Sequence, residues 1–171
     1  MGEWRVRVAL AVLAALGAAL MGRSLAAACA RRGRTLRQAM DALQHLRIEM
    51  LERRLPLHAA LSHARFDVLR RVGGRMAAGG PAAEAWQALL PSLTRRGGAL
   101  DSLTREDISA LTTFFDGLGA GTRTAQEALF LSTTRELGRL EAEAAKNGAE
   151  KGKLYATLGL LFGLMLAIAF V

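Results

Sequence analysis

The side chains that most often bind metals or attack substrates are few and widely spaced in this sequence. Histidine and cysteine occur only at Cys29, His45, His58 and His63. A zinc site takes four ligands from such residues, and two histidines share a helix face when they are three or four residues apart. His58 and His63 are five apart. We therefore expect no metal site and no disulfide, and we interpret the histidines as surface or partly buried polar residues.

Two glycine-rich stretches resemble phosphate-binding loops only in part. Residues 74–79, GRMAAG, have the glycine spacing of a P-loop, but Gly80 and Pro81 follow where a P-loop has Lys and Ser or Thr. Residues 117–121, GLGAG, resemble a dinucleotide loop, but they follow a predicted helix and lack the strand that must precede such a loop. We interpret the second stretch as a helix break, and we expect no bound cofactor.

Two acidic pairs, Glu106–Asp107 and Glu141–Glu143, are the remaining candidates for acid and base chemistry. That chemistry needs two environments that separate the pKa values of the pair. On exposed helix faces these residues would be solvated caps or ion-pair partners, and this is the interpretation that we adopt. No combination of nucleophile, base and orienting residue can be assembled, so we expect no enzymatic activity.

Arginine dominates the charge of the chain. Twenty-three Lys and Arg stand against fifteen Asp and Glu, a formal net charge of +8, and only Lys146, Lys151 and Lys153 are lysines. Such an excess can bind nucleic acid through its phosphates. The arginines, however, are spread over all the predicted helices, with no interleaved aromatic side chains to stack on bases. We expect no nucleic-acid partner and favour contact with anionic lipid or with an acidic protein surface.

Long uncharged runs at both ends of the chain predict membrane spans. Residues 8–22 carry no charge, and neither do residues 154–171. The second run would form about 27 Å of helix, close to the thickness of a bilayer core. The first run could be a cleaved signal peptide, a lipoprotein signal that uses Cys29, or an uncleaved membrane helix. We adopt the last, which gives a first span within residues 1–30, a domain at 31–153 and a second span at 154–171.

The charges that flank these runs predict the orientation of the chain. Short flanks rich in Lys and Arg tend to stay in the cytoplasm. Four arginines follow the first run, at Arg31, Arg32, Arg34 and Arg37, and three lysines precede the second. Both termini are therefore expected outside the cell, with the domain between them in the cytoplasm.

The domain between the runs shows helical periodicity and no strand pattern. We predict an all-α fold, a cytoplasmic antiparallel bundle of about six helices between the two transmembrane helices. The helices are expected to begin at or near Thr35, Pro56, Phe66, Pro81, Thr104 and Thr124. Gly79 and Gly80 should end the third helix, and Pro91 should kink or stop the fourth. The residues expected to face the core include Leu36, Met40, Leu43, Leu46, Met50, Trp86, Ile108, Leu111, Phe114 and Phe115.

Two sets of residues are candidates for contacts beyond the bundle. Polar residues in the loops of a helical bundle are accessible, so the candidate partner contacts are Arg53, Arg54, Arg95 and Arg96. On a continuous last helix, one face would carry Gly148, Gly152, Gly159 and Gly163. Small residues spaced in this way let membrane helices approach closely, which predicts packing against the first span or another subunit. The alternative is that glycine is simply common in membrane helices.

Several segments resemble the stage III sporulation protein AB family of endospore-forming bacteria. Residues 36–61, LRQAMDALQHLRIEMLERRLPLHAAL, are similar to its first-helix pattern and Pro-Leu pair. Leu118-Gly119 followed by Gln126 resembles a later signature, and residues 153–163 resemble its C-terminal span. The chain departs from the pattern where Gly121 and Thr122 replace an acidic residue, so Thr124 is expected to cap the helix that follows.

The resemblance implies a bundle like that of type II secretion F platform proteins. It further implies membership of the mother-cell complex that, with a forespore partner, bridges the two membranes around the engulfed forespore. The expected partners are a cytoplasmic secretion-type ATPase, other membrane subunits of the channel and membrane lipid, with a homo-oligomer left open. Two alternatives remain: a lipid-binding or membrane-remodelling module without an ATPase partner, and an exported enzyme whose mature chain begins near Cys29 or Ala30.

Overall fold

The computed structural model describes residue 17 and residues 27–169, and every regular element in these residues is a helix. This confirms the predicted all-α class. Beyond Glu150, only the side chains of Leu154, Thr157, Leu158, Leu161 and Met165 are described. The chain divides into two compact units: Arg32–Ala142, which we call the bundle, and a second unit formed by Met1–Arg31 and Glu143–Val171.

The helices follow one another along the chain with short connections. A helix of residues 27–47, which we call the first helix, continues directly into a π-helical turn. The elements after it are η1 (Ile48–Glu52), α2 (Leu57–Ser62), α3 (Asp67–Met76), α4 (Ala82–Thr94), α5 (Arg105–Gly117) and α6 (Arg123–Ala169).

The first helix does not begin at the predicted capping box. Residues 27–47 are continuously helical, so Thr35 lies inside the helix, and its Oγ1 is 3.3 Å from Ser102 Oγ. The alanines that precede this position are strong helix formers. Because they carry the helix through Thr35, no free N-terminus exists there for a side chain to cap, and the prediction is wrong.

Proline marks the start of two helices, as predicted. Pro56 immediately precedes α2, and Pro81 immediately precedes α4, where the fixed φ of proline suits a helix start. Pro91, in contrast, does not stop α4, which continues to Thr94. Proline has no backbone N–H, so Pro91 cannot donate to the carbonyl of Gln87, yet the helix continues to Thr94.

Two more boundaries differ in detail from the prediction. Helix α3 ends at Met76, before Gly79 and Gly80, which take the left-handed φ values of 99° and 118°. Helix α6 begins at Arg123, and Thr122 rather than Thr124 provides the cap, because its Oγ1 accepts a hydrogen bond from Ala125 N at 3.3 Å. A capping residue stands just outside the helix, and Thr124 already lies inside it.

An aromatic cluster forms the centre of the bundle. Trp86 of α4 stacks on Phe115 of α5 with ring centroids 4.5 Å apart, and Phe114 meets Phe130 of α6 edge-on at 5.3 Å. The indole Nε1 of Trp86 donates to Thr112 Oγ1 at 2.9 Å, so the polar atom of this buried ring is satisfied. The cluster therefore joins three helices that are separate in sequence.

Aliphatic residues of every helix extend this core. Leu36, Leu43 and Leu46 of the first helix are buried as predicted, while Met40 and Met50 are partly buried and pack against the core. The other aliphatic side chains of the core that are at most 1% exposed are Ala39, Leu61, Val68, Val72, Ala82, Leu93, Leu100, Leu137 and Leu140.

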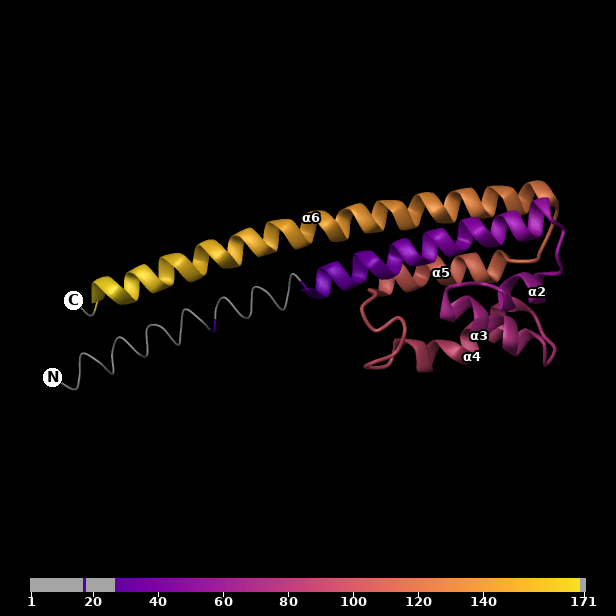
Figure 1. Cartoon of the computed structure of the whole chain (residues 1–171), viewed down its shortest axis with the longest axis horizontal. Coiled ribbons are helices and arrows are strands. Elements are labelled where there is room, and N and C mark those ends of the chain that lie inside the picture. Colours follow the sequence, from indigo (N-terminus) through magenta and orange to yellow (C-terminus); the bar gives the residue numbers. More distant parts are fainter. Residues whose placement is uncertain (1–16, 18–26, 170–171) are drawn as a thin grey trace. The chain divides into compact units, whose positions relative to one another are not determined.

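Within the bundle, the first helix and α6 run antiparallel and side by side (Figure 1). Arg37 Nε of the first helix donates to Glu141 Oε1 of α6 at 2.8 Å, and Met40 lies beside Gly138. The short helices form a chain of contacts, α2 on α3, α3 on α4 and α4 on α5.

Helix α6 is unbroken from Arg123 to Ala169. The last helix of the bundle therefore continues into the uncharged run of residues 154–171. Among the described residues, no helix has both the length and the apolar composition needed to cross a membrane. The predicted first span, residues 1–30, falls mostly outside the described residues, as do the last two residues of the predicted second span.

Candidate functional site

The described residues contain no group of three His, Cys, Asp or Glu side chains that could hold a metal ion. His45, His58 and His63 are all exposed.

The predicted contacts Arg53 and Arg54 lie in a tight turn between η1 and α2. Two backbone hydrogen bonds close the turn, from Arg53 N to Ile48 O at 3.1 Å and from Leu55 N to Glu49 O at 3.0 Å. The Arg53 side chain is 68% exposed and its Nη1 donates to Glu49 Oε1 at 2.9 Å. The two arginines are therefore exposed to solvent on a turn whose backbone is held by hydrogen bonds.

Arg54 has an unusual backbone conformation. Its φ is +56°, and it is the only residue other than glycine with a positive φ in the described part of the chain. A side chain in this left-handed region is strained by about 1–2 kcal/mol, because Cβ approaches the following carbonyl oxygen. Its guanidinium has no hydrogen-bond or ion-pair partner among the described residues, so no internal polar interaction of the side chain offsets the strain.

The second predicted pair, Arg95 and Arg96, lies between α4 and α5. Both side chains are exposed, and the carbonyl of Arg95 accepts a hydrogen bond from Gly98 N at 2.7 Å. In Figure 1 the segment joining α4 to α5 and the segment joining η1 to α2 lie at opposite ends of the bundle. The two arginine pairs therefore do not form one continuous surface.

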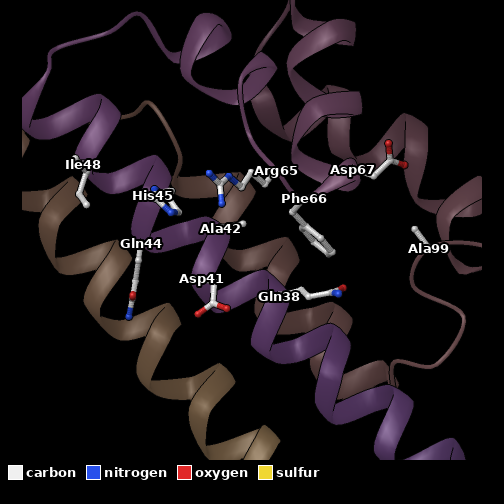
Figure 2. A pocket seen from close by; sticks show the side chains of 10 residues that line it. All are labelled: Gln38, Asp41, Ala42, Gln44, His45, Ile48, Arg65, Phe66, Asp67 and Ala99. Atoms are coloured by element: carbon white, nitrogen blue, oxygen red, sulfur yellow. The ribbon is translucent and has the colours of Figure 1, made fainter.

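A groove lies beside the first helix of the bundle, shown in Figure 2. Its volume is about 740 Å³. One wall is the first helix with the start of η1, and the other is the connection between α2 and α3 with the start of α3. The groove is lined by Gln38, Asp41, Ala42, Gln44, His45, Ile48, Arg65, Phe66, Asp67 and Ala99. The sequence analysis did not single out this groove, because its two walls are brought together only by folding.

Asp107 is fully buried, contrary to the prediction that it lies on a solvated helix face. Arg32 donates to it twice, from Nε to Oδ2 at 2.7 Å and from Nη2 to Oδ1 at 2.8 Å. The same carboxylate completes a capping box, accepting from Thr104 N at 2.8 Å. Burial raises the pKa of Asp107, but the hydrogen bonds from Arg32 and Thr104 and the charge of Arg32 together lower it below its ordinary value.

The other acids of the two predicted pairs lie nearer the surface. Glu106 is exposed and accepts from Arg139 of α6, and Glu141 is partly buried and accepts from Arg37. Two of the four arginines predicted to flank a membrane, Arg32 and Arg37, are thus paired with carboxylates of the bundle.

Gln126 closes the turn between α5 and α6. Its side chain is nearly buried; Nε2 donates to the carbonyl oxygens of Gly117 and Ala120, and Oε1 accepts from Gly119 N at 3.1 Å. The amide therefore satisfies backbone groups that the helix break leaves free. In the sequence analysis, Gln126 was named only as part of the family resemblance. The nearby glycines, which predict a helix break, could have indicated that a side chain is needed to satisfy the backbone there.

One of the four predicted packing glycines has a described close neighbour. A Cβ added to Gly148 of α6 would lie 3.0 Å from Cys29 Cβ of the first helix, so the helices pass closely at this point of the second unit. Gly152, Gly159 and Gly163 lie in α6, but their surroundings are outside the described residues. Packing of the four glycines in a membrane stays a prediction.

Comparison with known proteins agrees with the resemblance. The family described as "Stage III sporulation protein AB (spore_III_AB)" matches residues 7–171. A solved structure described as "Stage III sporulation protein AB (SpoIIIAB)" is 24% identical, with a TM-score of 0.58 over 70% of this chain and 97% of that chain. At this level of sequence identity, the structural match shows that the two proteins share a fold. No curated protein sequence matches. Because the family match spans nearly the whole chain, this protein belongs to the stage III sporulation protein AB family.

Proposed function

We propose that this sporulation protein is a non-enzymatic platform component of a secretion-like channel between mother cell and forespore. In this role it is anchored in the mother-cell membrane around the forespore by spans at residues 1–30 and 154–171. Its bundle faces the cytoplasm, docks a secretion-type ATPase and holds it against the membrane subunits of the channel.

The observation that carries the docking role is the strained, exposed Arg54. Glycine would adopt φ +56° without a steric penalty, and the guanidinium of Arg54 makes no hydrogen bond or ion pair with the described residues. Residues held in sparsely populated backbone regions cluster at binding sites and switches, where the strain is part of the mechanism. A charged side chain at such a position is explained if the guanidinium serves an external acidic partner.

The observation that supports the membrane anchor is the apolar surface of α6. The helix that contributes Phe130, Leu137 and Leu140 to the core continues to Ala169. Near its end, large apolar side chains recur at a spacing of four, three and four residues, which places them on one face. They are Leu154, Leu158, Leu161 and Met165, exposed by 59%, 52%, 57% and 58%. Such a row is expected to lie against lipid or protein.

Arg54→Gly tests the docking role. We expect this variant to raise the free energy of unfolding by about 1 kcal/mol, because it removes the left-handed strain, and to reduce ATPase recovery several-fold, because it removes the cation. Full-length protein in mild detergent would be co-purified with the secretion-type ATPase of the same organism, and thermal unfolding would be measured on the same samples.

Two variants control this experiment. Arg54→Lys keeps both the charge and the strain and should retain most of the ATPase, while Arg105→Ala removes an exposed arginine elsewhere and should change neither readout. Failure of the wild-type chain to retain the ATPase would contradict the proposed function. If the Arg54→Gly variant retained the ATPase as well as the wild type, this would contradict the role of Arg54 but not the proposed function as a whole.

Membrane placement predicts a second result. The full chain should remain in the membrane fraction after carbonate extraction, and protease added outside intact mother cells should leave the bundle intact, since the cytoplasmic domain is out of its reach. Immunoblotting with an antibody to the bundle would measure both outcomes. Release by carbonate, or digestion from outside, would contradict the predicted spans and orientation.

A further inference from the structure

The groove beside the first helix is lined along one wall by a single helix face. Its residues on the first helix and η1 include Gln38, Asp41, His45 and Ile48, which recur every three or four positions and therefore share one face over about three turns. Ala42 is buried beneath this face, and the half-buried ring of Phe66 lies at the opposite wall. Grooves that combine apolar and polar side chains can receive an amphipathic helix.

The two walls of the groove carry opposite charges that the bundle leaves unpaired. Asp41 lies on the first helix and Arg65 on the connection between α2 and α3 (Figure 2). Both are exposed, and neither has an ion-pair or hydrogen-bond partner among the described residues. The other acid of the groove, Asp67, is already paired with Arg70 and Arg71. An occupant with an anion near Arg65 and a cation near Asp41 would complement the charges of the groove.

A second copy of this chain meets both requirements with the same two residues. In an interface with two-fold symmetry, residue i of one subunit contacts residue j of the other, and j contacts i. Asp41 of each copy can then face Arg65 of the other. The wall that bears Asp41 is itself an exposed helical ridge of about three turns, which is the size of element that the groove would accept.

We propose that this groove is a homodimer interface in which the first helices of two copies lie antiparallel, with Asp41 of each copy paired to Arg65 of the other. A lipid chain would leave both charges unsatisfied, which disfavours it as the occupant. The interface does not involve Arg54 and does not depend on the docking of an ATPase.

Complementary charge reversals test this pairing. Asp41→Arg places two cations at each contact of its own dimer, and Arg65→Asp places two anions there. We expect each variant alone to raise the dissociation constant of the dimer by at least about tenfold. An equimolar mixture of the two variants should restore the dimer, because both contacts of the mixed pair are again Asp with Arg. The double variant Asp41→Arg/Arg65→Asp should also restore it.

The measurement is analytical ultracentrifugation of the full chain in a mild nonionic detergent, at low and at high salt. Asp116→Arg and Arg75→Asp make the same changes of charge on exposed residues outside the groove, and they should dimerise like the wild type. Restoration by mixing also shows that each single variant is folded. If either single variant fails to fold, Asp41→Asn and Arg65→Gln replace the reversals, and each should weaken the dimer.

The other outcomes overturn the proposal. A wild-type chain that is monomeric at every concentration shows that a second copy does not occupy the groove, and leaves a helix of another protein as its occupant. A dimer that persists in both single variants forms through a different surface. Loss of the dimer in the single variants without restoration in the mixture shows that Asp41 and Arg65 do not contact each other.

Discussion

Replacing Asp107 by alanine is expected to lower the free energy of unfolding by about 3–5 kcal/mol. Asp107 is fully buried and receives two hydrogen bonds from Arg32, whose side chain is only 13% exposed. Removing one partner of a buried ion pair leaves the other charge without its counter-ion in a poorly solvated position. The substitution also removes the reciprocal cap of α5, since Asp107 Oδ2 no longer accepts from Thr104 N. Urea unfolding followed by circular dichroism would measure the loss.

Neighbouring substitutions separate the contributions to this effect. Thr104→Ala removes the capping hydroxyl but keeps the ion pair, and should cost about 1 kcal/mol. Glu106→Ala removes an exposed acid that pairs with Arg139 at the surface, and should change stability by about 0.5 kcal/mol or less. A loss for Asp107→Ala no larger than that for Thr104→Ala would show that the pair with Arg32 contributes little.

The same residue predicts a dependence of stability on pH. Burial raises the pKa of Asp107, yet the hydrogen bonds and the charge around it hold its pKa in the folded protein below the ordinary value of 3.8. A group with a lowered folded pKa contributes stability above its unfolded pKa and loses that contribution as the pH falls through the folded pKa. The difference in stability between wild type and Asp107→Ala should therefore be constant near neutral pH and shrink below about pH 4. A difference that grows on acidification would contradict the lowered pKa.

Gly73→Ala is expected to destabilise the bundle by about 1–3 kcal/mol through overpacking. Gly73 is buried in α3 where that helix meets α2, and a Cβ there would lie 2.7 Å from Ser62 N and 2.8 Å from Leu61 Cβ. The clash involves backbone and a Cβ atom, which cannot rotate away, so one of the two helices must shift.

The adjacent glycine provides a matched control for this substitution. An added Cβ at Gly74 meets nothing within 4 Å, so Gly74→Ala should stabilise α3 by about 0.5–1 kcal/mol through its higher helix propensity. Thermal unfolding of the two variants under identical conditions would measure the opposite effects. Equal stability of the variants would show that α2 and α3 do not approach closely at Gly73.

The candidate contacts could be predicted from the sequence in part. The exposure of Arg53, Arg54, Arg95 and Arg96 follows from their positions in connections between helices, where polar side chains meet solvent. The left-handed backbone of Arg54 could not be predicted, because it results from the way η1 closes the turn before α2. The groove with Asp41 and Arg65 was missed for a similar reason, since its walls are separated along the chain.

By itself, the sequence determined the helical class, the family and the helix starts whose signals are local. These signals act on backbone groups only a few residues away, so the local sequence is enough to recognise them. They are Pro56, Pro81 and the pair Thr104–Asp107. Only the tertiary structure decided that Gly73 lies where two helices touch and that Asp107 is buried. Arg32 is 75 residues from Asp107 in sequence. The sequence around Asp107 predicts a helix cap, but its burial and its ion pair depend on which distant side chain packs over it.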